Sequence, residues 1–117
     1  MALSGILSAA VSGLAYASSK VAASADNVAN VNTAGYQAKD VRSSAIATRQ
    51  RAGTGYASGG VSSVVRTKPD PTLSGGSNVD LASEFVKIIE ATIAYKANAK
   101  VIAAGDALAK ELVDIKA

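Results

Sequence analysis

The stretch ANVNTAGY, residues 29–36, separates two different sequence patterns. Asn and Thr side chains compete with a helix by bonding to nearby backbone groups, and Gly35 can adopt the left-handed conformation that ends one. We therefore predict that a helix ends near residues 29–33 and that the chain turns a corner there. The predicted corner residues are Asn27, Ala29, Asn30, Asn32, Thr33, Gly35 and Tyr36.

Upstream of this stretch, residues 1–31 carry a heptad repeat. Apolar residues recur at every seventh position, and mostly small residues alternate with them at the three/four spacing of a coiled-coil seam. The remaining positions are rich in serine and hold only two charged residues, Lys20 and Asp26. A helix with so uncharged an outer face suits one that is surrounded by other chains. Its predicted packing residues are Leu3, Leu7, Leu14, Val21 and Val28.

Downstream of the corner, residues 38–68 predict a loose β-hairpin or two short strands. A weakly alternating stretch leads into the glycine-rich run RAGTGYASGG, residues 51–60, and the β-branched run at 61–67 is typical of a strand. Two linkers follow. The proline-containing stretch 68–71 is predicted to be stiff, and the Ser/Gly stretch 74–77 to be flexible.

A second helix is predicted from residues 78–80 to the C-terminus. Ser77 and Asp80 resemble a capping box at its start, and apolar residues again recur at three/four spacing. Asp106 interrupts this apolar seam beside Gly105, so we predict a weak point there. The seams of the two helices are expected to pack against each other, within one subunit or between two. The packing residues predicted for this helix are Leu81, Phe85, Ile88, Tyr95, Ile102 and Val113.

The predicted fold is mainly α: two long terminal helices form a coiled-coil-like pair, with a small β-hairpin or loop insert between them, in an elongated protomer. Three segments follow, namely an N-terminal helix at 1–33, a corner, β region and linker at 34–77, and a C-terminal helix at 78–117. Hydrophobic residues make up 49% of the chain but aromatic residues only 4%, so a compact core would be thin. We expect the chain to bury apolar faces against neighbours.

The composition excludes several classes of protein. The chain has no Cys and no His, which rules out thiolate and imidazole metal sites and the Ser-His-Asp triad. A site of carboxylates, Lys or Tyr stays open, but the nine acidic residues are scattered among Lys and Arg and form no obvious pair. We therefore predict no enzyme, no cofactor, no metal and no small-molecule substrate. No apolar run reaches the roughly 18–20 uncharged residues of a membrane span. The first 17 residues resemble the apolar part of a signal peptide but lack its basic start, since the first basic residue is Lys20.

The net charge of +3 is unevenly distributed: between residues 39 and 68, six basic residues face only Asp40. This region could be a solvated face, could meet acidic neighbours in an assembly, or could bind nucleic acid or anionic lipid. The aromatic residues that a single-strand binder interleaves with its basic ones are missing. The candidate electrostatic interface consists of Arg42, Arg49, Arg51, Arg66 and Lys68.

Two motifs carry a resemblance to a known family. The stretch 29–36 resembles the A-N-x-x-T-x-G-Y/F signature of the bacterial flagellar basal-body rod, hook and hook-associated proteins. Residues 78–98 resemble the C-terminal helix of the same family, and are closest to its proximal rod protein FlgC. The order of helix, corner, short β region, linker and helix also agrees with that family.

The resemblance implies a structural axial subunit of the bacterial flagellum. It would be exported without a cleaved signal by the flagellar type III apparatus, and its terminal helices would polymerise into a helical tube in the basal-body rod, in the periplasmic space. The implied partners are copies of itself, other rod proteins and the export apparatus, with no nucleic acid and with the membrane only by proximity. From the residues alone, the alternative is a basic helical binding module such as a nucleic-acid or membrane-surface adaptor.

Overall fold

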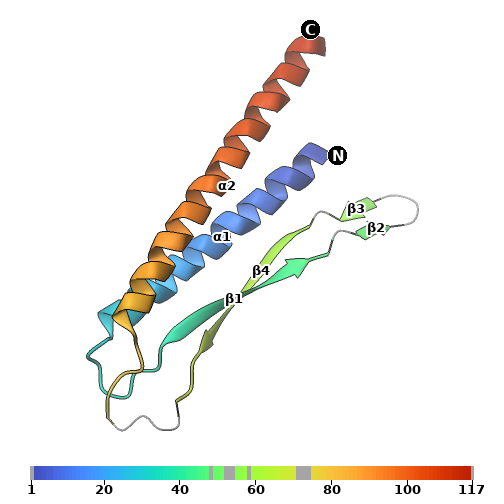
Figure 1. Ribbon diagram of the computed structural model, residues 1–117. Helices are drawn as coiled ribbons and strands as arrows, with labels where there is room; N and C mark the ends of the chain where they lie inside the picture. Colours follow the sequence, from blue (N-terminus) through green and yellow to red (C-terminus); the bar gives the residue numbers. More distant parts are fainter. Residues whose placement is uncertain (1, 48, 52–54, 58, 71–74, 117) are drawn as a thin grey trace.

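The structure is a computed structural model that describes residues 2–47, 49–51, 55–57, 59–70 and 75–116. A β-hairpin region lies between two long helices in the sequence, and the molecule extends over 67 × 31 × 14 Å (Figure 1). The mainly helical, elongated fold predicted from the sequence is confirmed. Its elements are α1 (Ala2–Ala29), β1 (Lys39–Ile46), β2 (Arg49–Arg51), β3 (Gly55–Ala57), β4 (Gly60–Thr67) and α2 (Leu81–Lys116).

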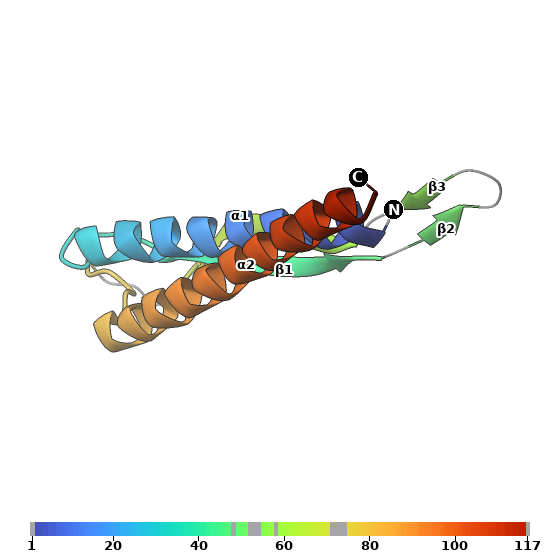
Figure 2. The same ribbon diagram turned by 90° about the horizontal axis from the view of Figure 1, so that it is seen from above.

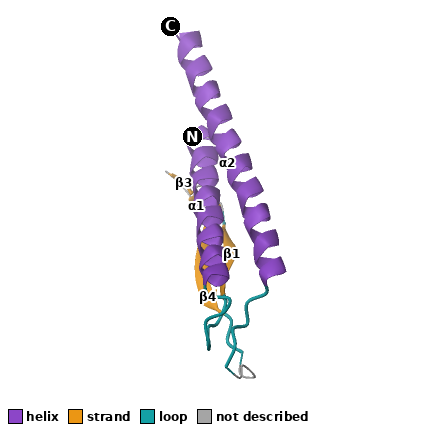
Figure 3. Cartoon of the chain, turned by 90° about the vertical axis from the view of Figure 1, so that its left-hand side faces the viewer, coloured by secondary structure: helices purple, strands orange, loops and turns teal. Residues whose placement is uncertain are grey.

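Helix α1 is the central element of the fold. It packs against α2 on one side and against strands β1 and β4 on another (Figure 3). The two helices run in opposite directions and cross at an angle (Figures 1 and 2). The C-terminal end of α2 reaches beyond the N-terminal end of α1 (Figures 1 and 3). Among the described elements, α2 packs mainly against α1. Most of the circumference of α2 therefore faces solvent.

The insert is a long antiparallel hairpin. Strand β1 pairs with β4 from Lys39↔Thr67 to Ile46↔Gly60, and β2 pairs with β3 nearer the tip. Ser12 on α1 anchors the hairpin, because its Oγ accepts a hydrogen bond of 3.0 Å from the Val61 N–H. A glycine is needed at position 60, where φ is +147° and a Cβ atom would lie 2.7 Å from Ser12 Oγ.

The interior consists mainly of small side chains. Its buried hydrophobic residues include four alanines that are at least 96% buried, at positions 10, 17, 38 and 91. The chain exposes 7951 Å² of surface, whereas a compact monomer of 11.6 kDa would expose about 5,800 Å². The chain therefore exposes about 2,000 Å² more surface than a compact monomer of the same mass, which agrees with the thin core expected from the composition.

The start of α2 differs from the prediction. Asp80 is the capping residue: its Oδ1 accepts a hydrogen bond of 3.2 Å from the Ala82 N–H, and its carbonyl accepts the first helical bond, from Glu84. The predicted capping box of Ser77 with Asp80 is wrong. Ser77 instead donates to the Val31 carbonyl at 2.6 Å, which ties the linker to the end of α1.

One sequence expectation about membranes is also corrected. Helix α1, over Leu3–Ala29, is long enough and apolar enough to cross a membrane by length and composition. The sequence pattern predicts no such segment, because serines and glycines interrupt every apolar run. A signal sequence or a packed helix of a soluble protein meets the same test. In the structure, one face of this helix packs on α2 and another on the hairpin.

Candidate assembly surface and the corner that supports it

Asn27 holds the corner together. Its side chain is fully buried, with 0% exposure. Its Nδ2 donates to the Lys39 carbonyl at 2.8 Å, and its Oδ1 accepts from the Lys39 N–H at 2.7 Å and from the Tyr36 hydroxyl at 3.0 Å. The amide thus pairs with the backbone of β1 as a neighbouring strand would. This one side chain joins the last turn of α1 to the hairpin.

The other polar residues of the predicted corner build the turn itself. Asn30 donates from Nδ2 to the Asp26 carbonyl at 2.9 Å, and Thr33 donates from Oγ1 to Asn30 Oδ1 at 3.1 Å. The Tyr36 N–H then bonds the Thr33 carbonyl at 3.2 Å, which closes the turn. Four residues of the predicted set are exposed, namely Ala29, which ends α1, Asn32, Thr33 and Gly35.

Gly35 has φ of +73°, which confirms the left-handed conformation predicted for it, and its N–H bonds the Gly76 carbonyl at 3.2 Å. A Cβ atom at position 35 would meet nothing within 4 Å, so a substitution is opposed only by the backbone conformation. Gly35→Ala should therefore lower the free energy of unfolding by about 1 kcal/mol. Gly35→Asn should cost less, since asparagine tolerates this conformation better.

The measurement is thermal unfolding followed by circular dichroism at 222 nm. Gly76→Ala is the matched control, because a Cβ atom at Gly76 would also meet open space but the residue has no left-handed φ. An equal loss of stability in Gly35→Ala and Gly76→Ala would contradict the backbone argument.

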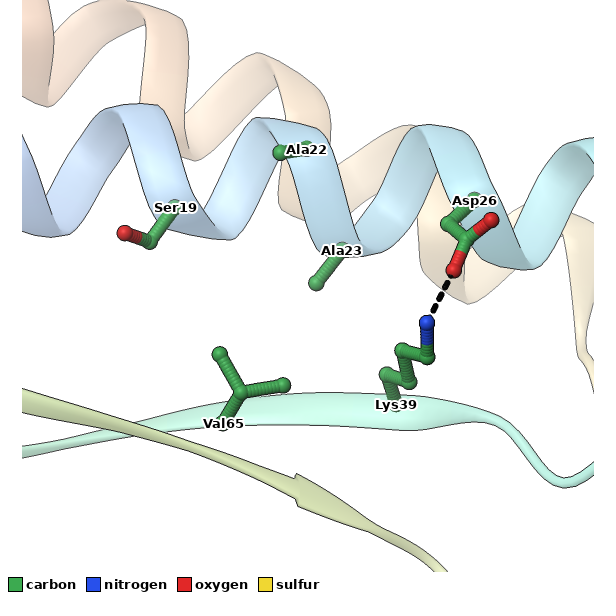
Figure 4. Close-up of a pocket in the computed structure, with 6 residues that line it drawn as sticks. All are labelled: Ser19, Ala22, Ala23, Asp26, Lys39 and Val65. Carbon is green, nitrogen blue, oxygen red and sulfur yellow. Dashed lines mark hydrogen bonds and ion pairs between the residues drawn. The ribbon is translucent and has the colours of Figure 1, made fainter.

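An ion pair lies beside the corner. Lys39 Nζ bonds Asp26 Oδ2, joining β1 to α1 (Figure 4). The hydrogen bond from Lys39 lowers the pKa of Asp26, and the same bond raises the pKa of Lys39. Desolvation, with a further contribution from the charge of Asp26, raises the pKa of Tyr36. All three pKa shifts favour the charge states that exist near neutral pH, namely an ionised Asp26, a protonated Lys39 and a neutral Tyr36.

These shifts predict how stability depends on pH. Because the pKa of Asp26 is lower in the folded chain, its contribution is present above the ordinary value of 3.8 and disappears as pH falls through the folded value. Because the pKa values of Tyr36 and Lys39 are raised, their contributions disappear as pH rises beyond about 10. We expect the thermal midpoint of unfolding to fall at both low and high pH.

In Asp26→Asn the decline of the thermal midpoint below about pH 4 should be shallower than in the wild type. Identical acid profiles of the variant and the wild type would contradict a stabilising role for the Asp26 carboxylate.

A buried carboxylate also lies near the corner. Glu84, 3% exposed, accepts a hydrogen bond of 3.3 Å at Oε1 from Lys87, while its Oε2 has no hydrogen-bond partner in the described part of the chain. Lys87 Nζ also lies 3.9 Å from Asp40 Oδ1, so it links the start of α2 to β1. The i, i+3 pair of Glu84 with Lys87 lies on a packed face of α2, because Glu84 is buried.

The site next to the corner does not resemble a catalytic centre. A shallow groove of about 500 Å³ lies between α1 and the hairpin, lined by Ser19, Ala22, Ala23, Asp26, Lys39 and Val65 (Figure 4). Its charged groups are the paired Asp26 and Lys39. Among the described residues, no group of three or more acidic, His or Cys side chains is placed to hold a metal ion.

On α1, two of the predicted packing residues, Leu3 and Leu7, lie beside Gly105 of α2. Leu3, Leu7, Leu14, Val21 and Val28 are half-buried, and the small residues of the same heptad are buried between them: Ala10, Ala17 and Ser24. The two helix backbones approach closely here. A Cβ on Gly13 would lie 2.6 Å from the Asn98 side chain, and one on Gly105 would lie 2.8 Å from Leu7 Cδ2.

On α2, only part of the predicted seam is covered within the single chain, and packing of the rest between subunits stays a prediction. Of the predicted residues, only Ile88 and Ile102 are half-buried, whereas Leu81, Phe85, Tyr95 and Val113 are 39%, 53%, 47% and 69% exposed. The buried positions are Glu84, Ala91 and Gly105. The helices approach through small residues, so the bulky ones point elsewhere. Gly105 is a close contact between the helices and not a weak point, which corrects that prediction.

Helix α2 therefore carries large apolar side chains on its free faces, among exposed charged ones. A second stripe of large side chains is exposed along it, at Val86, Ile89, Ile93, Val101, Leu108, Leu112 and Ile115. A continuous set of exposed large apolar side chains marks a surface for interaction with other proteins. The single chain supplies only α1 as a covering, so the candidate functional site is this uncovered surface of α2.

The basic residues of the hairpin are only partly placed. Arg42, Arg66 and Lys68 are exposed, and Arg42 Nε lies 3.8 Å from Asp40 Oδ2. Arg49 and Arg51 belong to β2, but their side chains lie outside the described residues. Their role as an electrostatic interface stays a prediction.

Comparison with known proteins gives two matches, one at each end of the chain. Residues 7–37 match the family described as flagella basal body rod protein, and residues 74–115 match the family described as flagellar basal body rod FlgEFG protein C-terminal. No curated protein matches the chain. The two segments contain α1 with the corner and α2 with the linker before it, and together they cover more than half of the chain. The closer likeness to FlgC stays a prediction.

Proposed function

The chain belongs to the flagellar basal-body rod protein family, and from this premise we propose that it polymerises through its terminal helices into a helical tube. The family is structural and not enzymatic, so the chain has a structural role in the basal body together with other rod proteins. We further propose that it reaches the periplasmic space through the flagellar type III export apparatus, without a cleaved signal.

One observation carries the proposal of polymerisation: α2 exposes large apolar side chains on the faces that α1 leaves free. Seven large aliphatic residues along it, from Val86 to Ile115, are 42–82% exposed. The excess of about 2,000 Å² of surface over a compact monomer exceeds the roughly 800 Å² that one partner buries in a standard interface. Contacts with more than one neighbour would cover it.

The same features support export as a loosely folded chain. The core consists mainly of alanines, and each buried alanine contributes little free energy compared with a large aliphatic side chain. A monomer with such a core is marginally stable, and it gains stability when neighbours bury its apolar faces. Such a chain is easy to unfold for passage through a channel and becomes ordered on assembly.

The proposal is tested by intact-mass spectrometry of detergent-resistant basal structures isolated from the native cell envelope. The expected result is a full-length chain within these structures, with no cleavage near Ala17. A chain shortened by the start of α1 and found only in the soluble periplasm would contradict both signal-less export and assembly, because the missing residues include Leu3 and Leu7, which lie beside Gly105 of α2.

A further inference from the structure

An exposed apolar ridge lies at the start of α2. Leu81, Phe85 and Ile89 are 39%, 53% and 59% exposed. They are spaced four residues apart and therefore form one continuous ridge on the helix surface. Phe85 is the only phenylalanine of the chain. An exposed aromatic residue flanked by aliphatic ones is a typical anchor of a protein–protein interface.

An apolar groove lies at the other end of the α1–α2 pair. It has a volume of about 740 Å³ and is lined mainly by Leu3, Ile6, Leu7, Leu108, Leu112 and Ile115. It lies between the first turns of α1 and the last turns of α2, where the two helices separate (Figure 1). Ile6, Leu108, Leu112 and Ile115 are each about half exposed or more, so the groove is open to an incoming side chain.

The ridge and the groove match in size but cannot meet within one molecule. At 1.5 Å per residue, the ridge is about 12 Å long and the wall from Leu108 to Ile115 about 10 Å. Phe85 and Leu112 are about 40 Å apart along the same straight helix. A ridge of one helix packs naturally between the ridges of two others. The occupant that the chain itself offers for the groove is therefore the ridge of a second copy.

We propose that the ridge Leu81–Phe85–Ile89 of one copy lies in the groove of a second copy, so that subunits join end to end. The surfaces on the two sides differ, so the contact is heterologous and leaves one ridge and one groove free at the ends of every chain of copies. Such a contact produces an open filament when the rotation between copies does not close a ring. This inference deepens the proposed polymerisation and rests on it, because it names which surfaces of two copies meet.

Cysteine cross-linking tests the contact, since the wild-type chain contains no cysteine. Phe85→Cys in one tagged copy and Leu112→Cys in a copy with a different tag are mixed and oxidised. A disulfide-linked heterodimer is expected, at a yield at least tenfold above the control. In the control, Ile93→Cys replaces Phe85→Cys, because Ile93 lies on the same helix and is 63% exposed. Equal yields from both pairs would overturn the proposal.

Two charge variants test the same contact without cross-linking. Phe85→Asp removes the ridge and keeps the groove, whereas Leu112→Asp removes the groove and keeps the ridge. In analytical ultracentrifugation each variant alone should lose the end-to-end association of the wild type, and an equimolar mixture should form a dimer that grows no further. A mixture that stays monomeric, or a wild type that does not associate, would overturn the contact.

The two proposals fail in different ways. If the wild-type chain is found in basal structures but the cysteines at positions 85 and 112 do not pair, the end-to-end contact is wrong and the rod assignment stands. If the cysteines pair in solution but the chain is absent from basal structures, the contact exists and the assembly lies elsewhere.

Discussion

Replacing Asn27 with alanine is expected to lower the free energy of unfolding by about 3 kcal/mol and to release the hairpin from α1. The side chain has 0% exposure and makes three hydrogen bonds, two of them to the backbone of Lys39. Alanine would leave the N–H and the carbonyl of Lys39 without these partners at a partly buried position. A desolvated N–H or carbonyl that loses its partner costs more free energy than the hydrogen bond contributes on balance when it is made.

Amide hydrogen exchange followed by NMR separates local from global loss of stability. In Asn27→Ala the Lys39 amide should exchange much faster, because its acceptor is gone. The Val61 amide, bonded to Ser12 on α1, should also lose protection if the whole hairpin detaches. Asn32→Ala is the control, since Asn32 is an exposed asparagine of the same corner. Unchanged protection of Lys39 in Asn27→Ala would contradict the pairing.

The variant Asn27→Asp separates the contribution of the Asn27 amide oxygen to stability from that of the amide nitrogen. Aspartate keeps an oxygen that can accept from Lys39 and Tyr36 but loses the Nδ2 donor to the Lys39 carbonyl. It also adds a negative charge next to Asp26. We expect stability between that of the wild type and that of Asn27→Ala, with a loss that grows as both carboxylates ionise.

The sequence predicted α1 and the corner well because their signals are local. The heptad of α1 alternates large and small residues, and the small ones, such as Ala10 and Ala17, are those buried against α2. The left-handed Gly35 and the bonds of Asn30 and Thr33 connect residues only a few positions apart. Turn chemistry of this kind depends on neighbours in the sequence.

The packed face of α2 could not be predicted in the same way. A periodic pattern identifies a packed face only when the other faces are polar, and α2 has large apolar residues all round. The bulky residues predicted to pack include Phe85 and Tyr95, which are exposed in the single chain. Ala91 and Gly105 are buried but are not among the predicted packing residues. The hydrogen bonds between the Asn27 side chain and the Lys39 backbone could not be predicted from the sequence either, because they depend on where the hairpin lies relative to α1.

The close approach of the helices gives the last prediction. Gly105→Leu should lower the free energy of unfolding by about 2–3 kcal/mol, because overfilling a tight contact forces the backbones apart. A Cβ at this position would lie 2.8 Å from Leu7 Cδ2 and 3.8 Å from Leu3 Cδ1. Gly105→Ala should be nearly neutral, since the end of the Leu7 side chain can move and alanine favours a helix by about 1 kcal/mol.

Ala104→Leu is the matched control, because Ala104 is the exposed neighbour of Gly105 and gains the same side chain. Spin labels at the exposed positions 15 and 97, measured by pulsed electron paramagnetic resonance, should report a wider separation of the helices in Gly105→Leu only. Because Leu3 and Leu7 also line the terminal groove, the same variant should weaken end-to-end association of copies. A stable Gly105→Leu variant with unchanged helix separation would mean that glycine is not required for this contact.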